Sequence, residues 1–206
     1  MKNLLSLLLL TVILASCASE DNPYMESLNK KGFTGDPCFP VNAEGDSPRQ
    51  AVLHGSRGSE NLVGTSHTDD VLLGRGGGDL YMVTLGTDLL LGFDPHTDLL
   101  DIGHLGRSMP NFKGLNSLAD LKNASKEIQV DGTIAVEIDV DGDLGHSTTT
   151  LLGVSLSDIT ELNVFFDSGA TAIPPLVYTD IVERQFIYPS GDTLAVAHGV
   201  CKQLEG

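Results

Sequence analysis

The chain has 206 residues, and its 28 acidic against 12 basic side chains give a formal charge of −16 at pH 7. This acidic balance argues against nucleic acid as a partner and favours a divalent cation. Tryptophan is absent and aromatic residues make up 5% of the chain, so a stacking platform for bases or sugars is not expected.

The first 16 residues predict a secretory signal peptide. Lys2 precedes an apolar run from Leu4 to Leu14, and the small residues Ala15 and Ser16 follow that run. The run is shorter than the about 20 apolar residues that a membrane-spanning helix needs. We therefore expect the folded part of the chain to lie outside the cytoplasm.

The tetrapeptide LASC, which ends at Cys17, resembles the lipobox of bacterial lipoproteins. The resemblance implies that Cys17 carries a lipid and anchors the protein in the cell envelope. Ala18 and Ser19 follow, which is similar to the pattern of lipoproteins in the outer membrane. The alternative is a plain secretory signal with an incidental cysteine, which would make the protein extracellular.

Residues 17–50 predict an anchor and tether, because they mix charges with proline, glycine and asparagine and show no sustained periodicity. Two further cysteines, Cys38 and Cys201, form an even pair in a chain that leaves the cytoplasm. We therefore predict a disulfide between them, which would close a long loop. Two unpaired buried thiols are the alternative.

A repeat of about nine residues begins at Gly55 and decides the expected fold class. Successive units read GSRGSENLV, GTSHTDDVLL, GRGGGDLYM, VTLGTDLLL and GFDPHTDLL, over residues 55–100. An acidic residue falls near the sixth place of each of the first four units, and an apolar residue follows two places later. The acidic residues are Glu60, Asp69 or Asp70, Asp79 and Asp88, and the apolar ones are Leu62, Leu72, Tyr81 and Leu90.

These units resemble the glycine- and aspartate-rich nonapeptides of repeats-in-toxin proteins, which form calcium-binding parallel β-helices. The resemblance implies an all-β fold in which residues 51–106 form a short parallel β-roll. Glycine permits positive φ in the turns, and stacked turns bring carboxylates together around calcium, which accepts about six to eight oxygens. The calcium-site residues that the resemblance implies are Glu60, Asp69, Asp70, Gly74, Gly76, Asp79, Gly86, Asp88 and Asp98.

Successive turns of such a roll lie on alternate sides, so its ligands are expected to pair two units apart. The expected pairs hold roughly one or two calcium ions and are Glu60 with Asp79, Asp69 or Asp70 with Asp88, and Asp79 with Asp98. Ser56, Arg75 and Thr84 are among the residues that stand where the family prefers glycine, and only the third unit is dense in glycine. Turns that bind no particular metal, or a roll that has lost its ions, are the alternatives.

The segment after the repeats resembles the end of the C-terminal domain of serralysin-type metallopeptidases. GFDPHTDLLDIGHLG, residues 92–106, is similar to the motif that ends that roll, and residues 128–166 are similar to its closing strands. We expect residues 107–168 to form a β-rich cap with one short helix, Ser117 as its N-cap and hairpin turns at two Asp-Gly pairs. Such a cap protects strand edges from aggregation. Residues 169–206 are a tail of unknown role.

Motifs for catalysis are not found, since the sequence has no H-E-x-x-H zinc motif, no G-x-S-x-G elbow and no phosphate-binding loop. The run DVDGD, residues 139–143, lacks the spacing of an EF-hand loop and predicts a hairpin turn. We therefore expect a non-enzymatic, secreted or lipid-anchored module that binds calcium and is ordered by it. Capture of a cell-surface protein or polysaccharide, with calcium only structural, and an enzyme that uses the scattered carboxylates are the alternatives.

Overall fold

The computed structural model describes residues 34–36, 39–64, 68–103, 115–141, 147–166, 179–180 and 183–197. The chain divides after Ser47 into two compact units. In the first unit, β1 (Thr34–Asp36) and β2 (Phe39–Val41) pair in antiparallel fashion. The segment predicted to be a tether therefore contains two short paired strands.

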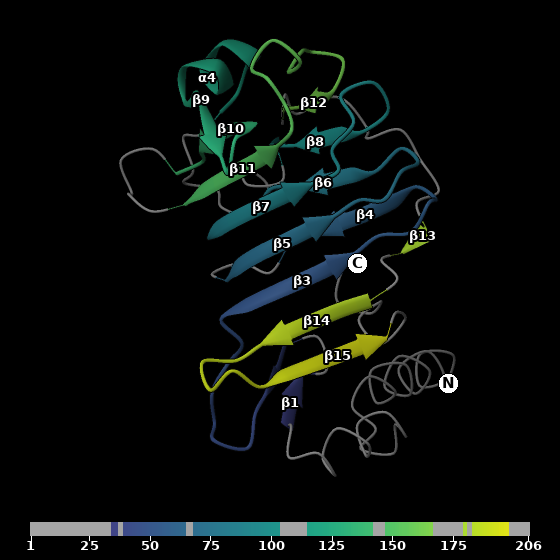
Figure 1. Cartoon of the computed structure of the whole chain (residues 1–206), viewed down its shortest axis with the longest axis vertical. Helices are drawn as coiled ribbons and strands as arrows, with labels where there is room; N and C mark the ends of the chain where they lie inside the picture. The colour runs from purple at the N-terminus through teal and green to yellow at the C-terminus, as the bar shows by residue number, and fades with distance from the viewer. Residues whose placement is uncertain are drawn as a thin grey trace, which may run out of the picture. The chain divides into compact units, whose positions relative to one another are not determined.

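From residue 50 to residue 101, consecutive strands of the second unit alternate between two sheets and pair in parallel within each sheet, which makes this part of the chain a β-roll (Figure 1). Each strand pairs with the strand two further along the chain. The prediction of an all-β fold with a short parallel β-roll is confirmed. One sheet holds β3 (Gln50–His54), β5 (Asp69–Leu73) and β7 (Thr87–Leu91), and the other holds β4 (Glu60–Val63), β6 (Leu80–Met82) and β8 (Leu99–Asp101).

The apolar positions of the repeat fill the interior of the roll. Leu62, Leu72, Tyr81 and Leu90 are all at most 1% exposed. The Tyr81 ring packs edge to face against Phe93, with 5.5 Å between the ring centroids. Burial of one leucine side chain stabilises the fold by about 1.5–3 kcal/mol, so these regularly spaced residues hold the two sheets together.

The predicted cap follows the roll and extends both sheets. Helix α4 (Leu118–Asn123) begins after Ser117, whose hydroxyl accepts a hydrogen bond from the Asp120 backbone N–H at 3.1 Å. Strands β9 (Ser125–Val130) and β10 (Thr133–Asp139) form a hairpin around the predicted Asp-Gly turn. Both turn residues have positive φ, 50° at Asp131 and 80° at Gly132, as expected for a type I′ turn.

The roll continues into this cap through two strand pairings. Strand β11 (Thr148–Leu152) pairs with β10 in antiparallel fashion and with β7 in parallel. Strand β12 (Val164–Phe165) pairs in parallel with β8. The β10–β11 connection is thus a hairpin, as predicted for DVDGD, although residues 142–146 of it lie outside the described residues. The last strands of both roll sheets are therefore covered.

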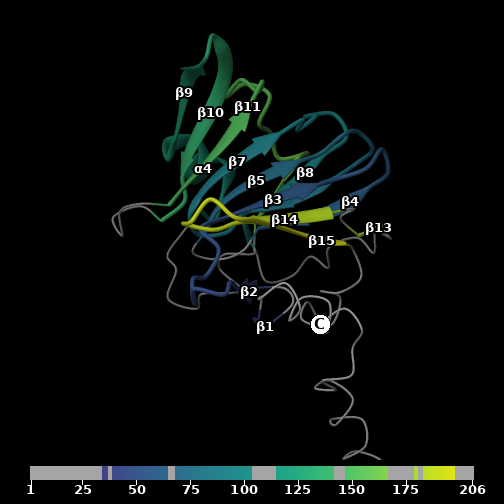
Figure 2. The ribbon, with the colours of Figure 1, turned by 60° about the horizontal axis from the view of Figure 1, so that its bottom comes forward.

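The C-terminal segment covers the other end of the roll, a role that the sequence left open. Strand β14 (Glu183–Ile187) pairs in antiparallel fashion with β3, and β15 (Thr193–Ala197) pairs with β14. Strand β13 (Thr179–Asp180) pairs in parallel with β4. The hairpin lies along β3, away from β9, β10 and β11 (Figure 2).

The predictions for the chain ends fall largely outside the described residues. The signal peptide, the lipidated Cys17 and the disulfide between Cys38 and Cys201 all lie there, so they stay predictions. A helix long and apolar enough to cross a membrane is not found in the part of the chain that the structure describes.

Candidate functional site: two rows of buried carboxylates

The acidic residues of the repeat lie within one residue of the start of the roll strands, where they form two rows. The turns before β4, β6 and β8 lie on one side of the roll, and the turns before β5 and β7 lie on the other. The carboxylates that follow these turns are at most 2% exposed. The Glu60 row consists of Glu60, Asp79 and Asp98, and the Asp70 row consists of Asp70 and Asp88.

Each row is held together by hydrogen bonds from the backbone to a carboxylate of the next coil. In the Glu60 row, the Glu60 N–H donates to Asp79 Oδ1 at 2.9 Å, and the Asp79 N–H donates to Asp98 Oδ1 at 2.9 Å. In the Asp70 row, the Ala51 N–H donates to Asp70 Oδ1 at 3.0 Å, and the Asp70 N–H donates to Asp88 Oδ1 at 3.2 Å. The structure thus brings together the residues that were expected to pair two units apart.

Burial makes the charged forms of these carboxylates costly. It is the largest cause that raises the pKa of Asp79 to about 7 and the pKa of Asp88 to about 8. The charges of Asp98 and Glu60 raise the pKa of Asp79 further, and the charge of Asp70 does the same to the pKa of Asp88. Burial also raises the pKa of Asp98. Without a cation, Asp79 and Asp88 therefore retain protons at pH values where free aspartates are ionised.

The Oδ2 atom of Asp79 is completely buried, and no group in the described part of the chain hydrogen-bonds to it. It lies against the turn that precedes it, because a Cβ atom on Gly74 would be 2.5 Å from Asp79 Oδ2 and 2.1 Å from Tyr81 Oη. The neighbouring Glu60 carboxyl can share a proton with Asp79, but it has nothing to donate when both are ionised. An ionised Asp79 therefore needs a positive partner.

The other residues predicted for the site have structural roles that the backbone explains. Gly76 and Gly86 have φ values of 116° and 129°, which favour glycine. Asp69 is exposed, and its Oδ1 accepts a hydrogen bond from the Thr87 N–H at 3.0 Å. Of the two adjacent candidates, Asp70 and not Asp69 therefore belongs to the buried row.

The oxygen atoms of the two rows fit a hard cation that also accepts backbone carbonyl oxygens as ligands. Among the described residues, no three His, Cys, Asp or Glu side chains form a group that could hold a metal ion. Backbone carbonyls would have to complete any site, and calcium accepts both kinds of oxygen. One candidate is Gly58 O, in the turn before Glu60, which lies 1.7 Å from where a Cβ atom of Gly77, in the turn before Asp79, would be.

Hydroxyl side chains also take part in the rows, and two of them, Ser56 and Thr84, stand in the sequence as departures from glycine. Ser56 Oγ donates to Glu60 Oε1, and Thr84 Oγ1 donates to Asp88 Oδ2 at 3.0 Å. Thr68 Oγ1 donates to Asp70 Oδ1 at 2.7 Å. A serine or threonine four residues before the acidic residue is the sequence signal that predicts two of these three contacts.

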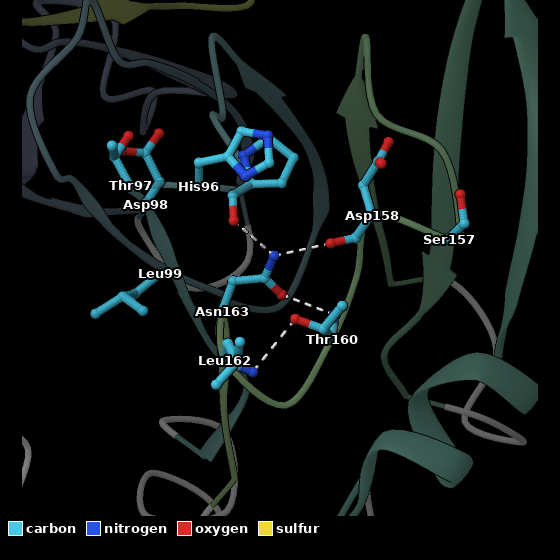
Figure 3. Close-up of a pocket in the computed structure, with 10 residues that line it drawn as sticks. His96, Thr97, Asp98, Leu99, Ser157, Asp158, Thr160, Leu162 and Asn163 are labelled. Carbon is cyan, nitrogen blue, oxygen red and sulfur yellow. Dashed lines mark hydrogen bonds between the residues drawn. The ribbon is translucent and has the colours of Figure 1, made fainter.

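A surface pocket lies where the last turn of the roll meets the cap (Figure 3). Asn163 joins the two parts, because its Nδ2 donates to Pro95 O at 3.0 Å and to Asp158 O at 2.8 Å. Its Oδ1 accepts from the Thr160 N–H at 2.8 Å. Hydrogen bonds from Ser155 hold the pKa of the exposed Asp158 below its usual range. The amide of Asn163 is thus fully used in fixing the cap to the roll.

Comparison with known proteins finds similar folds but no assigned family. No family model and no curated protein matches the chain. Two solution structures from the mannuronan C5-epimerase of Azotobacter vinelandii are similar to it. The AlgE6R3 subunit shares 20% identity with a TM-score of 0.40, over 61% of this chain and 82% of its own. The AlgE6R2 subunit shares 19% identity with a TM-score of 0.33, over 61% of this chain and 96% of its own.

Proposed function

We propose that the protein is a non-catalytic β-roll module that binds calcium and is ordered by it. The observation that carries this proposal is Asp79 Oδ2, a buried carboxylate oxygen that receives no hydrogen bond from the described residues. Asp79 lies in a row with two further buried carboxylates, Glu60 and Asp98. A divalent cation supplies the positive charge that such a row lacks, and calcium prefers carboxylate and carbonyl oxygens.

Calcium binding would then be coupled to folding. When they are ionised in metal-free protein, the buried carboxylates repel one another and disfavour the packed roll. An ion that binds the folded chain and not the unfolded chain stabilises the fold, by about 2.7 kcal/mol at a hundredfold excess over Kd. The ion's chemical contribution is charge neutralisation, while the chain's turns and strands position the oxygens.

Circular dichroism and thermal unfolding of the protein, first in chelator and then in millimolar calcium, test this proposal. We expect calcium to increase the β signal or to raise Tm, and magnesium at the same concentration to do so much less, because magnesium demands stricter geometry. If both quantities are the same in chelator and in calcium, the roll is a metal-free scaffold and the proposal is wrong.

We also propose that the module is attached to the cell envelope through a lipid on Cys17. The LASC tetrapeptide after the apolar run supports this proposal. Labelling with radioactive palmitate should therefore be lost in Cys17→Ser, and unchanged labelling would refute the anchor. Capture of a cell-surface protein or polysaccharide stays a prediction.

A further inference from the structure

The buried acidic residues of the roll differ in the residue that lies four positions before them in the sequence. Ser56 donates its hydroxyl to Glu60, and Thr84 donates its hydroxyl to Asp88 Oδ2 at 3.0 Å. In the Asp98 turn this place is taken by Asp94, whose backbone N–H donates to Asp98 Oδ2 at 2.8 Å. In each of these three turns, a donor at this place binds the carboxylate that ends the turn.

The turn before Asp79 has no such donor. Arg75 stands four residues before Asp79, and its exposed guanidinium points elsewhere, with Nη2 3.4 Å from His54 Nδ1. Three glycines, residues 76–78, fill the rest of this turn. The Gly78 N–H donates to Ser59 Oγ of the neighbouring turn at 3.1 Å. Asp79 Oδ2 is consequently left without a hydrogen bond from any described residue.

We propose that the roll binds a single divalent cation, at the turn of residues 74–79, with oxygens from Asp79 and Glu60. This inference rests on the proposed calcium binding and assigns it to one turn. Asp88 and Asp98 take no ion of their own, because both carboxylate oxygens of each already accept hydrogen bonds from donors within the chain. One calcium ion balances the two charges of Glu60 and Asp79.

The packing of the turns is consistent with this assignment. Turn 74–78 approaches turn 55–59 so closely that a Cβ atom on Gly77 would lie 1.7 Å from Gly58 O. A carbonyl oxygen and both carboxylates therefore belong to the same pair of turns. In the Asp70 row, a Cβ atom on Gly64 would instead lie 2.6 Å from Thr84 Oγ1 and 2.6 Å from Asp70 Oδ2. There, a hydroxyl lies next to the carboxylates.

Isothermal titration of the full-length protein with calcium chloride tests this inference. We expect a stoichiometry of one ion per chain in the wild type. Asp79→Asn should weaken calcium binding by at least about tenfold, since calcium affinity follows the charge of the ligands. Asp88→Asn is the matched control, because Asp88 is equally buried and equally placed in its repeat. It should retain the wild-type affinity within about twofold.

Circular dichroism shows whether Asp79→Asn folds. If it does not fold, a second variant tests the same site. Glu60→Gln keeps the acceptor for Ser56 and should also weaken calcium binding. Two or more ions per chain in the wild type, or a loss in Asp88→Asn as large as in Asp79→Asn, would overturn the single-site assignment. A wild type that binds no calcium at all would instead refute the proposed function itself.

Discussion

Asp79 and Asp88 show how one residue type at one repeat position meets different surroundings. Both are buried aspartates that accept a backbone hydrogen bond from the preceding coil of their row. Thr84 donates a second hydrogen bond to Asp88, whereas Asp79 faces a turn made of Arg75 and glycines. Asp88 therefore has a side-chain donor in its own turn, whereas Asp79 Oδ2 has none among the described residues.

At this scale, Gly74→Ala should destabilise the protein by about 1–3 kcal/mol, the usual range for overpacking. The added Cβ atom would lie 2.1 Å from Tyr81 Oη and 2.5 Å from Asp79 Oδ2. In a Tyr81→Phe background the first clash is absent, so the same substitution should cost less. Urea unfolding of the four proteins in this double-mutant cycle measures the difference. Equal costs in both backgrounds would show that Tyr81 does not restrict residue 74.

At the scale of elements, the roll depends on strands that cover its ends. The edges of parallel strands expose unpaired N–H and C=O groups that invite pairing with another chain. On one side β11 and β12 cover β7 and β8, and on the other side β14 and β13 cover β3 and β4. The C-terminal segment is therefore part of the folded unit and completes its sheets.

We expect Phe186→Ala to cost about 3–5 kcal/mol, as for other buried phenylalanines. Phe186 lies on β14 opposite Ala51 of β3 and is 0% exposed. Because the substitution loosens the strand that covers β3, it should also promote self-association, which sedimentation detects. Thr193→Ala, at an exposed position of the same hairpin, should stay within about 0.5 kcal/mol of the wild type in chemical unfolding. A Phe186→Ala protein as stable as this control would contradict the assigned role of β14.

At the scale of the whole molecule, the buried rows make the stability of the metal-free protein depend on pH. The pKa of Asp79 is raised from 3.8 to about 7, and the pKa of Asp88 is raised from 3.8 to about 8. At pH values between the unfolded and the folded pKa values of these groups, the folded state binds more protons than the unfolded state. The stability that these groups contribute is thus complete below about pH 4 and is lost as pH rises through their folded pKa values.

We therefore expect the free energy of unfolding in chelator to fall from about pH 4 to about pH 8, contrary to the usual behaviour of salt-bridged carboxylates. Urea titrations across this window measure it. Asp88→Asn should reduce the fall, because it removes one of the titrating groups. Calcium should stabilise the protein more at pH 8 than at pH 5, since protons compete with the ion. Metal-free stability that rises over this window would refute the pKa assignment.

Much of this architecture can be predicted from the sequence, because the repeat and the alternation of side chains along a strand both have a short period. The nine-residue spacing predicted the roll, and Leu62, Leu72, Tyr81 and Leu90 are buried as expected. Ser117 and the Asp-Gly pair at 131–132 also fixed their helix start and turn, because capping and positive φ act over a few residues. Local chemistry is sufficient for these features.

Only the tertiary structure decided features that depend on residues distant in sequence. The choice of Asp70 over Asp69, and the hydrogen bond that links Asp79 to Glu60 across 19 positions, follow from how the coils stack. The tail had no readable role because its partner, β3, lies more than a hundred residues upstream. The sequence also did not show which carboxylates have hydrogen-bond donors. A threonine in place of glycine donates only to an oxygen that the folded roll brings within its reach.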